Sequence, residues 1–205
     1  MISAHPLLAR RPARQAPSLS LLSGADELQL VQGRVHEACG PSRRTLAMWI
    51  AMQTEGPVIW ISPSWAKDRL GSDGVSAWIN PSRLLFISPK RAEDLLWAME
   101  EVLRSGALAL CVADLPDLPG LTQIRRLHLA AETGAQNGQP PPTGVLLTPS
   151  KGGAPGVETR WHIAPRHGQG QECWHLERLR ARTAPHKSWL IGRCSANEAP
   201  RIKTA

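Results

Sequence analysis

The first turn from an expected strand into an expected helix is where phosphate chemistry would be placed. Its residues are Gly40, Pro41, Ser42, Arg43, Arg44 and Thr45. Consecutive backbone N–H groups and a helix N-terminus can hold phosphate oxygens at such a turn. A phosphate-binding loop needs two glycines around four residues, followed by Lys and then Ser or Thr. This turn has one glycine and no lysine, so we expect a helix start with solvated arginines, and Arg43 or Arg44 is left as a possible contact for an anion.

Asp114 is the other residue that could take part in nucleotide chemistry. It follows residues 107–113, the most apolar run of the chain, and so stands at the carboxyl end of an expected buried strand. Ligands of open α/β sheets bind at that end of the strands. Because aspartate is also a common capping residue after a strand, and no lysine accompanies it, we expect Asp114 to be structural.

The histidines and cysteines do not have the spacing of a metal site. Seven His are scattered along the chain, and His162 and His167 lie five residues apart in an expected turn. The cysteines form no CxxC pair and lie far apart, at Cys39, Cys111, Cys173 and Cys194. We therefore expect no metal, no cofactor and no disulfide framework, and a reducing cytoplasm as the compartment.

Tryptophan and arginine recur together in the last quarter of the chain. Such pairs stack nucleic-acid bases or anchor a protein partner when exposed, and the same alternation is equally typical of an edge-strand core. The candidates for partner or DNA contact here are Arg160, Trp161, Trp174, Arg178, Arg180 and Arg182, with Trp189 in the same pattern. Arg125 and Arg126, on an expected helix, are further candidates. Trp49, Trp60 and Trp97 have core-like spacing and are expected to be packing residues.

Charge is divided unevenly over the 205 residues, which carry a net charge of +7. Residues 1–23 carry +3, residues 24–159 carry −2 and residues 160–205 carry +6. Basic ends of this kind meet nucleic acid or an acidic protein surface, or they only keep the chain in solution. With 42% hydrophobic residues, the chain can bury a core, which excludes disorder throughout. No apolar run approaches the roughly 20 residues that cross a bilayer, and no secretory signal opens the chain, so no membrane contact is expected.

Hydrophobic periodicity predicts an α/β fold with a mainly parallel sheet flanked by helices. Expected strands cover residues 30–38, 58–61, 83–87, 107–113 and 145–147, the fourth of them central. Expected helices cover residues 43–53, 89–104 and 121–135, with Ser42 as the first cap. After them, antiparallel strands are expected at one edge of the sheet, over residues 159–164, 173–180 and 188–191.

The same pattern divides the chain into three parts. Residues 1–25, rich in Pro, Ser and Arg, are expected to form a flexible basic N-terminal arm. Residues 26–192 form the domain, and residues 193–205 are expected to be a flexible, polar C-terminal tail.

Five segments, taken in order, resemble the RecA recombinase core and, within it, the ImuA family of RecA-related accessory proteins of damage-induced mutagenesis in bacteria. They span most of the domain and are residues 33–37 (GRVHE), 96–101 (LWAMEE), 103–107 (LRSGA), 125–132 (RRLHLAAE) and 159–162 (TRWH). The resemblance implies a RecA-like fold whose phosphate-wrapping residues are deleted.

What the chain lacks matters as much as what it shares. A RecA-type ATPase needs a P-loop lysine, a magnesium carboxylate, a glutamate that activates water and a glutamine that senses the γ-phosphate. The resemblance places the glutamate position near Ser64 and the glutamine position near Pro149, and only Asp114 remains. Without the lysine and the metal, phosphoryl transfer has little electrostatic help. We therefore expect a pseudo-ATPase with no catalytic residue and a vestigial nucleotide site.

The resemblance implies a non-catalytic adaptor in an SOS-type response to DNA damage, which supports error-prone translesion synthesis. Its implied partners are an ImuB-like protein related to Y-family polymerases, RecA itself, and DNA through the basic ends. Two alternatives remain open. One is a single-stranded DNA-binding protein, and the other is a cell-division inhibitor that resembles SulA.

Overall fold

The computed structural model describes residues 17–138, 140–168, 171–182, 184–195 and 198–203. Its helices are α1 (Arg43–Met52), α2 (Ser72–Ser76), α3 (Ala92–Ser105) and α4 (Leu121–Asn137), with a 3-10 turn at Pro81–Arg83. Its strands in the first half are β1 (Ser18–Ser20), β2 (Gln29–Val31), β3 (Val35–Cys39), β4 (Val58–Ile61) and β5 (Leu84–Ile87). Those that follow are β6 (Leu110–Asp114), β7 (Thr143–Thr148), β8 (Thr159–Pro165), β9 (Glu172–Ala181), β10 (Lys187–Arg193) and β11 (Arg201–Ile202).

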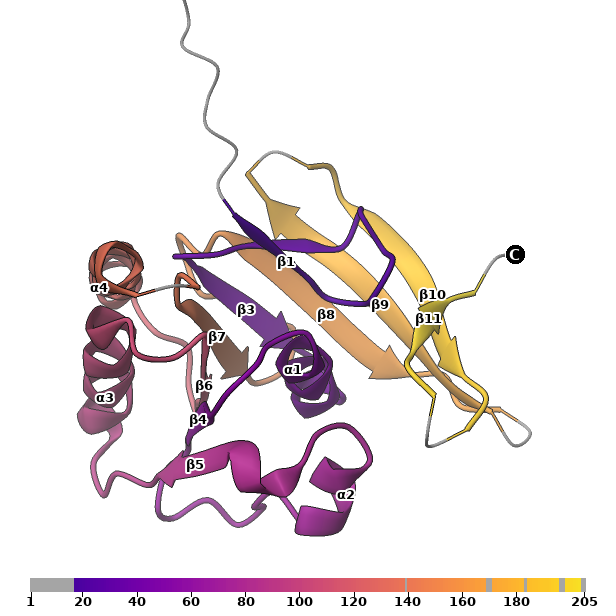
Figure 1. The fold of residues 1–205 in the computed structure, drawn as a ribbon, viewed down its shortest axis with the longest axis horizontal. Helices are drawn as coiled ribbons and strands as arrows, with labels where there is room; N and C mark the ends of the chain where they lie inside the picture. Colours follow the sequence, from indigo (N-terminus) through magenta and orange to yellow (C-terminus); the bar gives the residue numbers. More distant parts are fainter. Residues whose placement is uncertain (1–16, 139, 169–170, 183, 196–197, 204–205) are drawn as a thin grey trace, which may run out of the picture.

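One nine-stranded sheet organises the molecule (Figure 1). Its strand order is β11-β10-β9-β8-β3-β7-β6-β4-β5. The six strands from β8 to β5 are parallel, and β9, β10 and β11 extend the sheet in antiparallel fashion. The expected fold class, an α/β fold with a mainly parallel sheet and antiparallel strands at the C-terminal end, is confirmed.

Both faces of the parallel strands are covered. Every residue of β3, β4, β6 and β7 is buried, as expected of apolar runs in a sheet with helices on both sides. On one face α1 and the β1–β2 ribbon pack into one apolar cluster, and on the other face α3 and α4 pack into a second (Figure 1). Among the described helices, none combines the length and apolarity that a bilayer span requires.

Two details of the predicted sheet are wrong. The expected strand over residues 30–38 is divided into β2 and β3 by a turn, in which Gly33 has a φ of +70°. Strand β8 runs parallel to β3, whereas antiparallel pairing was expected from residue 159 onward. The reason is the connection from β7 to β8, in which residues 149–158 return along the sheet so that β8 starts at the same end as β3. Ser42 occupies the N-cap position of α1, but its side chain makes no capping hydrogen bond.

The expected N-terminal arm is wrong over residues 17–25, because this segment belongs to the domain. β1 pairs with β2, and Leu21 and Leu22 are buried in the same cluster as Leu28 and Leu30. These leucines supply an apolar face that outweighs the Pro and Ser content of the segment. The rest of the expected arm, residues 1–16, lies outside the described residues.

The expected C-terminal tail is also wrong in its described part. Residue 193 ends β10, and β11 pairs with β10 through Ile202 and Ile191. The N–H of Lys203 donates to the carbonyl of Leu190 at 2.8 Å, so the chain continues the sheet. Residues 196–197 and 204–205 lie outside the described part.

Tryptophan rings join the antiparallel strands to α1. Trp174 of β9 meets Trp49 of α1 edge to face, with ring centroids 5.2 Å apart, and Trp78 packs against both. Trp161 and Trp189 pack together at 5.9 Å, and the Arg178 guanidinium lies over both rings. Aromatic pairs of this geometry contribute beyond the area that they bury.

The backbones of α3 and α4 approach each other closely at the C-terminal ends of the two helices. Gly106 ends α3 with a φ of +65°, which favours glycine. A Cβ on Gly134 of α4 would stand 2.0 Å from the carbonyl oxygen of Leu103, and one on Gly138 would stand 1.9 Å from that of Gly106. Glycine at these positions lets the two backbones touch.

The tryptophan cluster generates a first prediction. Replacing buried Trp174 by Ala should lower the free energy of unfolding by about 3–5 kcal/mol, the usual cost of a large aromatic cavity. Trp97→Ala is the matched control, because 59% of the Trp97 side chain is exposed and its removal leaves no cavity. Urea denaturation followed by far-UV circular dichroism measures both. Equal losses in the two variants would contradict the packing described.

Candidate functional site

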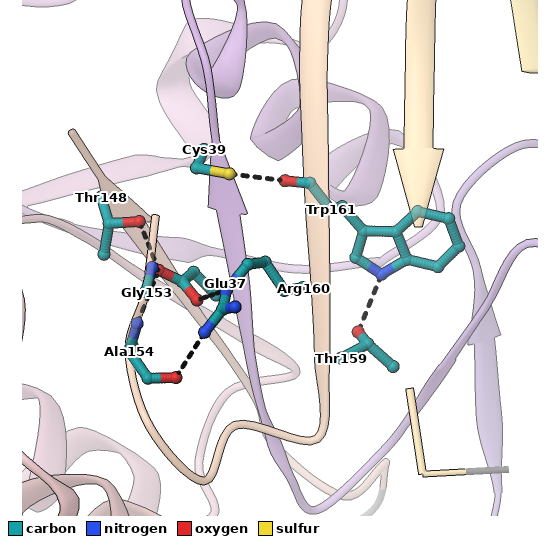
Figure 2. A network of polar contacts seen from close by, with 8 residues as sticks. All are labelled: Glu37, Cys39, Thr148, Gly153, Ala154, Thr159, Arg160 and Trp161. Carbon is teal, nitrogen blue, oxygen red and sulfur yellow. Dashed lines mark hydrogen bonds and ion pairs between the residues drawn. The ribbon is translucent and has the colours of Figure 1, made fainter. Parts of the chain in front are cut away.

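A buried glutamate lies at the centre of the sheet (Figure 2). Glu37 is on β3, between β7 and β8, and has no exposed surface. Its Oε1 accepts hydrogen bonds from the Thr148 hydroxyl at 2.6 Å and from the N–H groups of Gly153 and Ala154 at 2.8 and 3.1 Å. Its Oε2 accepts from Nε of Arg160. Both carboxylate oxygens are therefore satisfied by protein donors.

The Glu37 carboxylate holds the β7–β8 connection against the sheet. Arg160 on β8 also donates from Nη2 to the Ala154 carbonyl at 2.9 Å, which closes a ring of contacts with Glu37. Gly152 lies so close that a Cβ there would be 2.6 Å from Oε1 of Glu37. The connection thus passes over the carboxyl ends of β3 and β7, the region where an open α/β sheet binds ligands.

Cys39, the last residue of β3, is inert in this setting. Its thiol donates to the Trp161 carbonyl at 3.4 Å (Figure 2). Burial, reinforced by the negative charge of Glu37, raises the pKa of the thiol to about 12. A nucleophilic or metal-binding cysteine needs its thiolate form near neutral pH, so Cys39 acts here as a packing residue.

Two backbone donors of the turn between β3 and α1 are bound by neighbouring strand and loop carbonyls. The N–H of Gly40 donates to the Ser150 carbonyl at 3.0 Å, and the N–H of Ser42 donates to the Ile163 carbonyl at 3.2 Å. Gly40 has a φ of +91°, and a Cβ there would lie 2.5 Å from the Ile163 carbonyl oxygen. In a phosphate-binding loop these N–H groups point at the ligand, whereas here neighbouring strand and loop carbonyls accept them.

The expected vestigial site is brought together in space. At the start of α1, Arg43 and Arg44 reach across β7 to Asp114 at the end of β6. Arg44 Nε lies 2.7 Å from Oδ2 of Asp114, and Arg43 Nη2 lies 3.5 Å from its Oδ1. Arg44 also donates to the Asp68 carbonyl at 3.0 Å. A buried Asp114 is thereby neutralised by arginine, so the two arginines are not the solvated residues expected from the sequence.

A shallow hollow of about 340 Å³ lies beside these ion pairs. Its wall includes Trp65 and Lys67 from the connection that follows β4. Pro41 is exposed and Thr45 partly buried in the first turn of α1. The hollow brings two arginines and a lysine together with two carboxylates, those of Asp68 and Asp114. The carboxylates cancel much of the positive charge that an anionic ligand would need.

Two buried histidines brace the segment that leads into Glu37. His36 contacts the Thr159 hydroxyl at 2.7 Å and the Val31 carbonyl at 2.9 Å. His128 of α4 accepts the N–H of Val35 at Nδ1, so Nε2 carries the proton and donates to the Gly156 carbonyl at 3.1 Å. Desolvation lowers the pKa of His36 to about 4 and that of His128 below its ordinary value. Both rings are therefore neutral near pH 7.

Several expected contact residues are structural instead. Trp161 and Trp174 are buried, and they belong to the core because they face α1 and the β1–β2 ribbon. Arg178 is buried, and it donates to the carbonyls of Glu27 and Pro185 at 3.0 and 3.1 Å. Arg160 is bound to Glu37. Trp161, Trp174 and Arg178 are therefore buried away from a partner or a base, and the partly buried Arg160 has its guanidinium held by Glu37.

The remaining candidates are exposed but lie on different elements. Arg125 and Arg126 lie on α4, and Arg126 pairs with Glu100 of α3 at 2.8 Å. Arg180 is exposed near the end of β9, and Arg182 pairs with Glu158 at 3.4 Å. The expected set is thus divided between a helical face and one end of the antiparallel strands.

Sequence reasoning missed a groove between the N-terminal halves of α3 and α4. The core-like spacing of Trp97 predicted burial, but this side chain is exposed at the groove. Its position on α3, directly beside the stripe of Leu95, Met99 and Leu103, misled the periodicity argument. The signal that could have found the groove is acidic, because Glu93, Asp94, Glu100 and Glu101 are concentrated on this one helix.

The Glu37 network generates a second prediction. Glu37→Ala should lower the free energy of unfolding by about 3–5 kcal/mol, since it removes the charge partner of Arg160 and leaves the buried Thr148 hydroxyl and the buried Ala154 N–H without their acceptor. Glu101→Ala, at an exposed pair with Arg104, is the control and should cost about 0.5 kcal/mol or less. Urea denaturation at pH 7 measures both. A loss in Glu37→Ala no larger than the control would show that the network is dispensable.

The buried histidines generate a third prediction. Since the folded pKa of His36 is near 4 and its ordinary value is 6.5, the unfolded chain binds more protons between these values. Stability from this group is present above pH 6.5 and is lost as the pH falls towards 4, by about 3 kcal/mol in all. Urea midpoints between pH 7 and pH 4 measure the slope. In the variant His36→Asn the urea midpoint should depend less on pH over this range. An unchanged dependence would contradict the assignment of this loss of stability to His36.

Three features of the described residues bear on function. They are the turn between β3 and α1, the exposed arginines on α4 and at the end of β9, and the groove between α3 and α4. No group of three or more His, Cys, Asp or Glu side chains is placed to hold a metal among the described residues. Comparison with models of known protein families and with curated protein sequences gave no match.

Proposed function

We propose that the protein is a non-catalytic, RecA-like adaptor that works in the cytoplasm in an SOS-type response to DNA damage. In this role it supports error-prone translesion synthesis by binding an ImuB-like, polymerase-related protein, and RecA as a second partner. It neither hydrolyses ATP nor needs a cofactor.

The observation that carries the proposal is the occupied turn between β3 and α1. The N–H groups of Gly40 and Ser42 already donate to main-chain carbonyls, and Asp114 is held by two arginines. A nucleotide would have to displace these contacts without the lysine that neutralises its phosphates. The carboxyl ends of these strands are thus occupied by contacts within the protein, which supports a binding module better than an ATPase.

The residues that carry the resemblance to the ImuA family also support the proposal, because they bind one another. Arg34 pairs with Glu132, His36 with Thr159, and Glu37 with Arg160. A fourth pair joins Glu100 to Arg126. These polar residues of the five segments connect strands and helices to one another, so they stabilise the fold and are not available for a reaction.

The exposed arginines favour a protein partner over single-stranded DNA as the main ligand. A DNA-binding face needs aromatic rings beside its cations, and Trp161, Trp174 and Trp189 are buried. Arg125 precedes Arg126 on α4, and Arg126 pairs with Glu100, which gives a mixed charge pattern that suits a protein surface. DNA contact through the basic ends remains the second candidate.

Co-purification tests this proposal and gives a fourth prediction. The full chain, co-expressed with the ImuB-like protein and separately with RecA from the same genome, should retain the ImuB-like partner. Arg125→Glu should weaken retention about tenfold or more if α4 carries the contact, because a like charge replaces a rim cation. Arg180→Glu on β9 is the matched control. Point variants are preferable to a chain that ends before β9, because loss of β9 and β10 would expose the buried tryptophan residues of the core.

Three outcomes would count against the adaptor. If neither the ImuB-like protein nor RecA co-purifies with the chain, the adaptor has neither of its proposed partners. Stoichiometric ATP hydrolysis that Asp114→Asn abolishes would show a working nucleotide site. Affinity for single-stranded DNA that falls steeply with salt, without any protein partner, would favour the DNA-binding alternative.

A further inference from the structure

The groove between α3 and α4 is continuous with a second hollow beside the β6–α4 connection. The first, of about 310 Å³, lies between the two helices, and the second, of about 250 Å³, reaches the connection around Leu118. Glu93, Leu96 and Gln123 line both of them. The groove lies at the N-terminal halves of the two helices, away from the glycine contact at their C-terminal ends.

The lining of this groove combines apolar anchors with acidic side chains. Trp97 and Leu118 are 59% and 50% exposed, which makes them two of the most exposed large apolar side chains among the described residues. The acidic side chains are Glu93, Asp94, Glu100 and Asp117, and Arg126 is the basic residue of the lining. Glu100 is paired with Arg126 and with Arg104. The lining still has four carboxylates against one arginine, so it is suited to a basic, apolar segment.

The ion pairs at the rim can exchange with those of an incoming segment. Arg91 pairs with Glu93 and Asp94, but 68% of its side chain is exposed, and exposed pairs are worth little. Asp117 is exposed in the β6–α4 connection and lines the second hollow. New arginines would therefore meet carboxylates whose present contacts cost little to replace.

The chain itself contains a segment with the matching chemistry. Residues 1–16, outside the described part, contain the pair Leu7 and Leu8, followed by Arg10, Arg11 and Arg14, and they contain no acidic residue. We propose that residues 1–16 bind in cis to the α3–α4 groove, with the leucines against Trp97 and the arginines at the acidic rim.

Geometry and concentration both permit this contact. The described chain begins at Pro17, whose carbonyl accepts the N–H of Gln32. β1 lies on the α1 face of the sheet, and the groove lies on the other face. Gly33, the residue after Gln32, lies against Ala131 and Ala135 of α4. The ten residues from Leu7 to Pro17 span about 33 Å when extended, which allows the leucines to reach along α4 towards the groove. A tethered segment meets its site at an effective concentration of about 1 mM, so even weak binding keeps the groove occupied.

Tryptic cleavage of the full chain tests the proposal and gives a fifth prediction. Trypsin cuts after Arg10 and Arg14, and intact-mass spectrometry follows the loss of the first residues. Neutralising the groove by Glu93→Gln, Asp94→Asn and Asp117→Asn together should raise the cleavage rate about tenfold, the ratio of the effective concentration to a dissociation constant of about 0.1 mM. Trp97→Ala, and Leu7→Ser with Leu8→Ser, should raise it similarly.

The matched control neutralises three exposed carboxylates outside the groove, by Asp26→Asn, Glu55→Gln and Asp73→Asn, and it should cleave like the wild type. None of these substitutions creates a new tryptic site. Equal cleavage rates in the groove variants and in the control would overturn the proposal. Protection that increases with protein concentration would also overturn it, because the segment would then bind a second copy. A rate that is independent of concentration supports binding in cis.

Discussion

The buried carboxylate of Glu37 is the interaction on which the rest of the structure depends. It lies on β3, where the two apolar layers meet, and an unpaired charge there would be too costly to keep. Four donors, from β7, from the β7–β8 connection and from β8, resolve that cost. Together they fix the connection over the sheet, bring β8 parallel to β3 and place Ser150 where its carbonyl accepts the N–H of Gly40.

The filled turn at α1 follows from that arrangement. In an open α/β sheet the carboxyl ends of the strands are the natural ligand edge. In this protein the β7–β8 connection and the pairing of Arg43 and Arg44 with Asp114 occupy that edge. The surfaces left to recognise other molecules are the helical face around α3 and α4 and the outer end of the antiparallel strands. Their mixed charge and exposed apolar side chains are properties of protein-binding surfaces.

The sequence predicted the parallel core well, because residues 58–61 and 107–113 are short apolar runs bounded by turn residues. It also brought Arg43, Arg44 and Asp114 into one site. It did not predict the partners of Glu37 or the contact of His36 with Thr159, since these partners are more than 100 positions away in the sequence. Periodicity placed Trp97 in the core and left the role of Trp161 open, because spacing along one strand or helix does not show which face another element covers. Leu21 and Leu22 were assigned to an arm because the segment around them is rich in Pro and Ser.

The position of β3 has a consequence for the order in which the chain acquires its structure. This strand is made early, yet its neighbours on both sides, β7 and β8, begin at Thr143 and Thr159. At a synthesis rate of roughly 5–20 residues per second, β3 waits about ten seconds before either neighbour has left the ribosome. The apolar surface of β3 and the charge of Glu37 have no native partners during that interval. The parallel core can therefore form completely only after Arg160, the arginine that binds Glu37, has been synthesised. A ribosome-bound chaperone therefore has its longest opportunity at this strand.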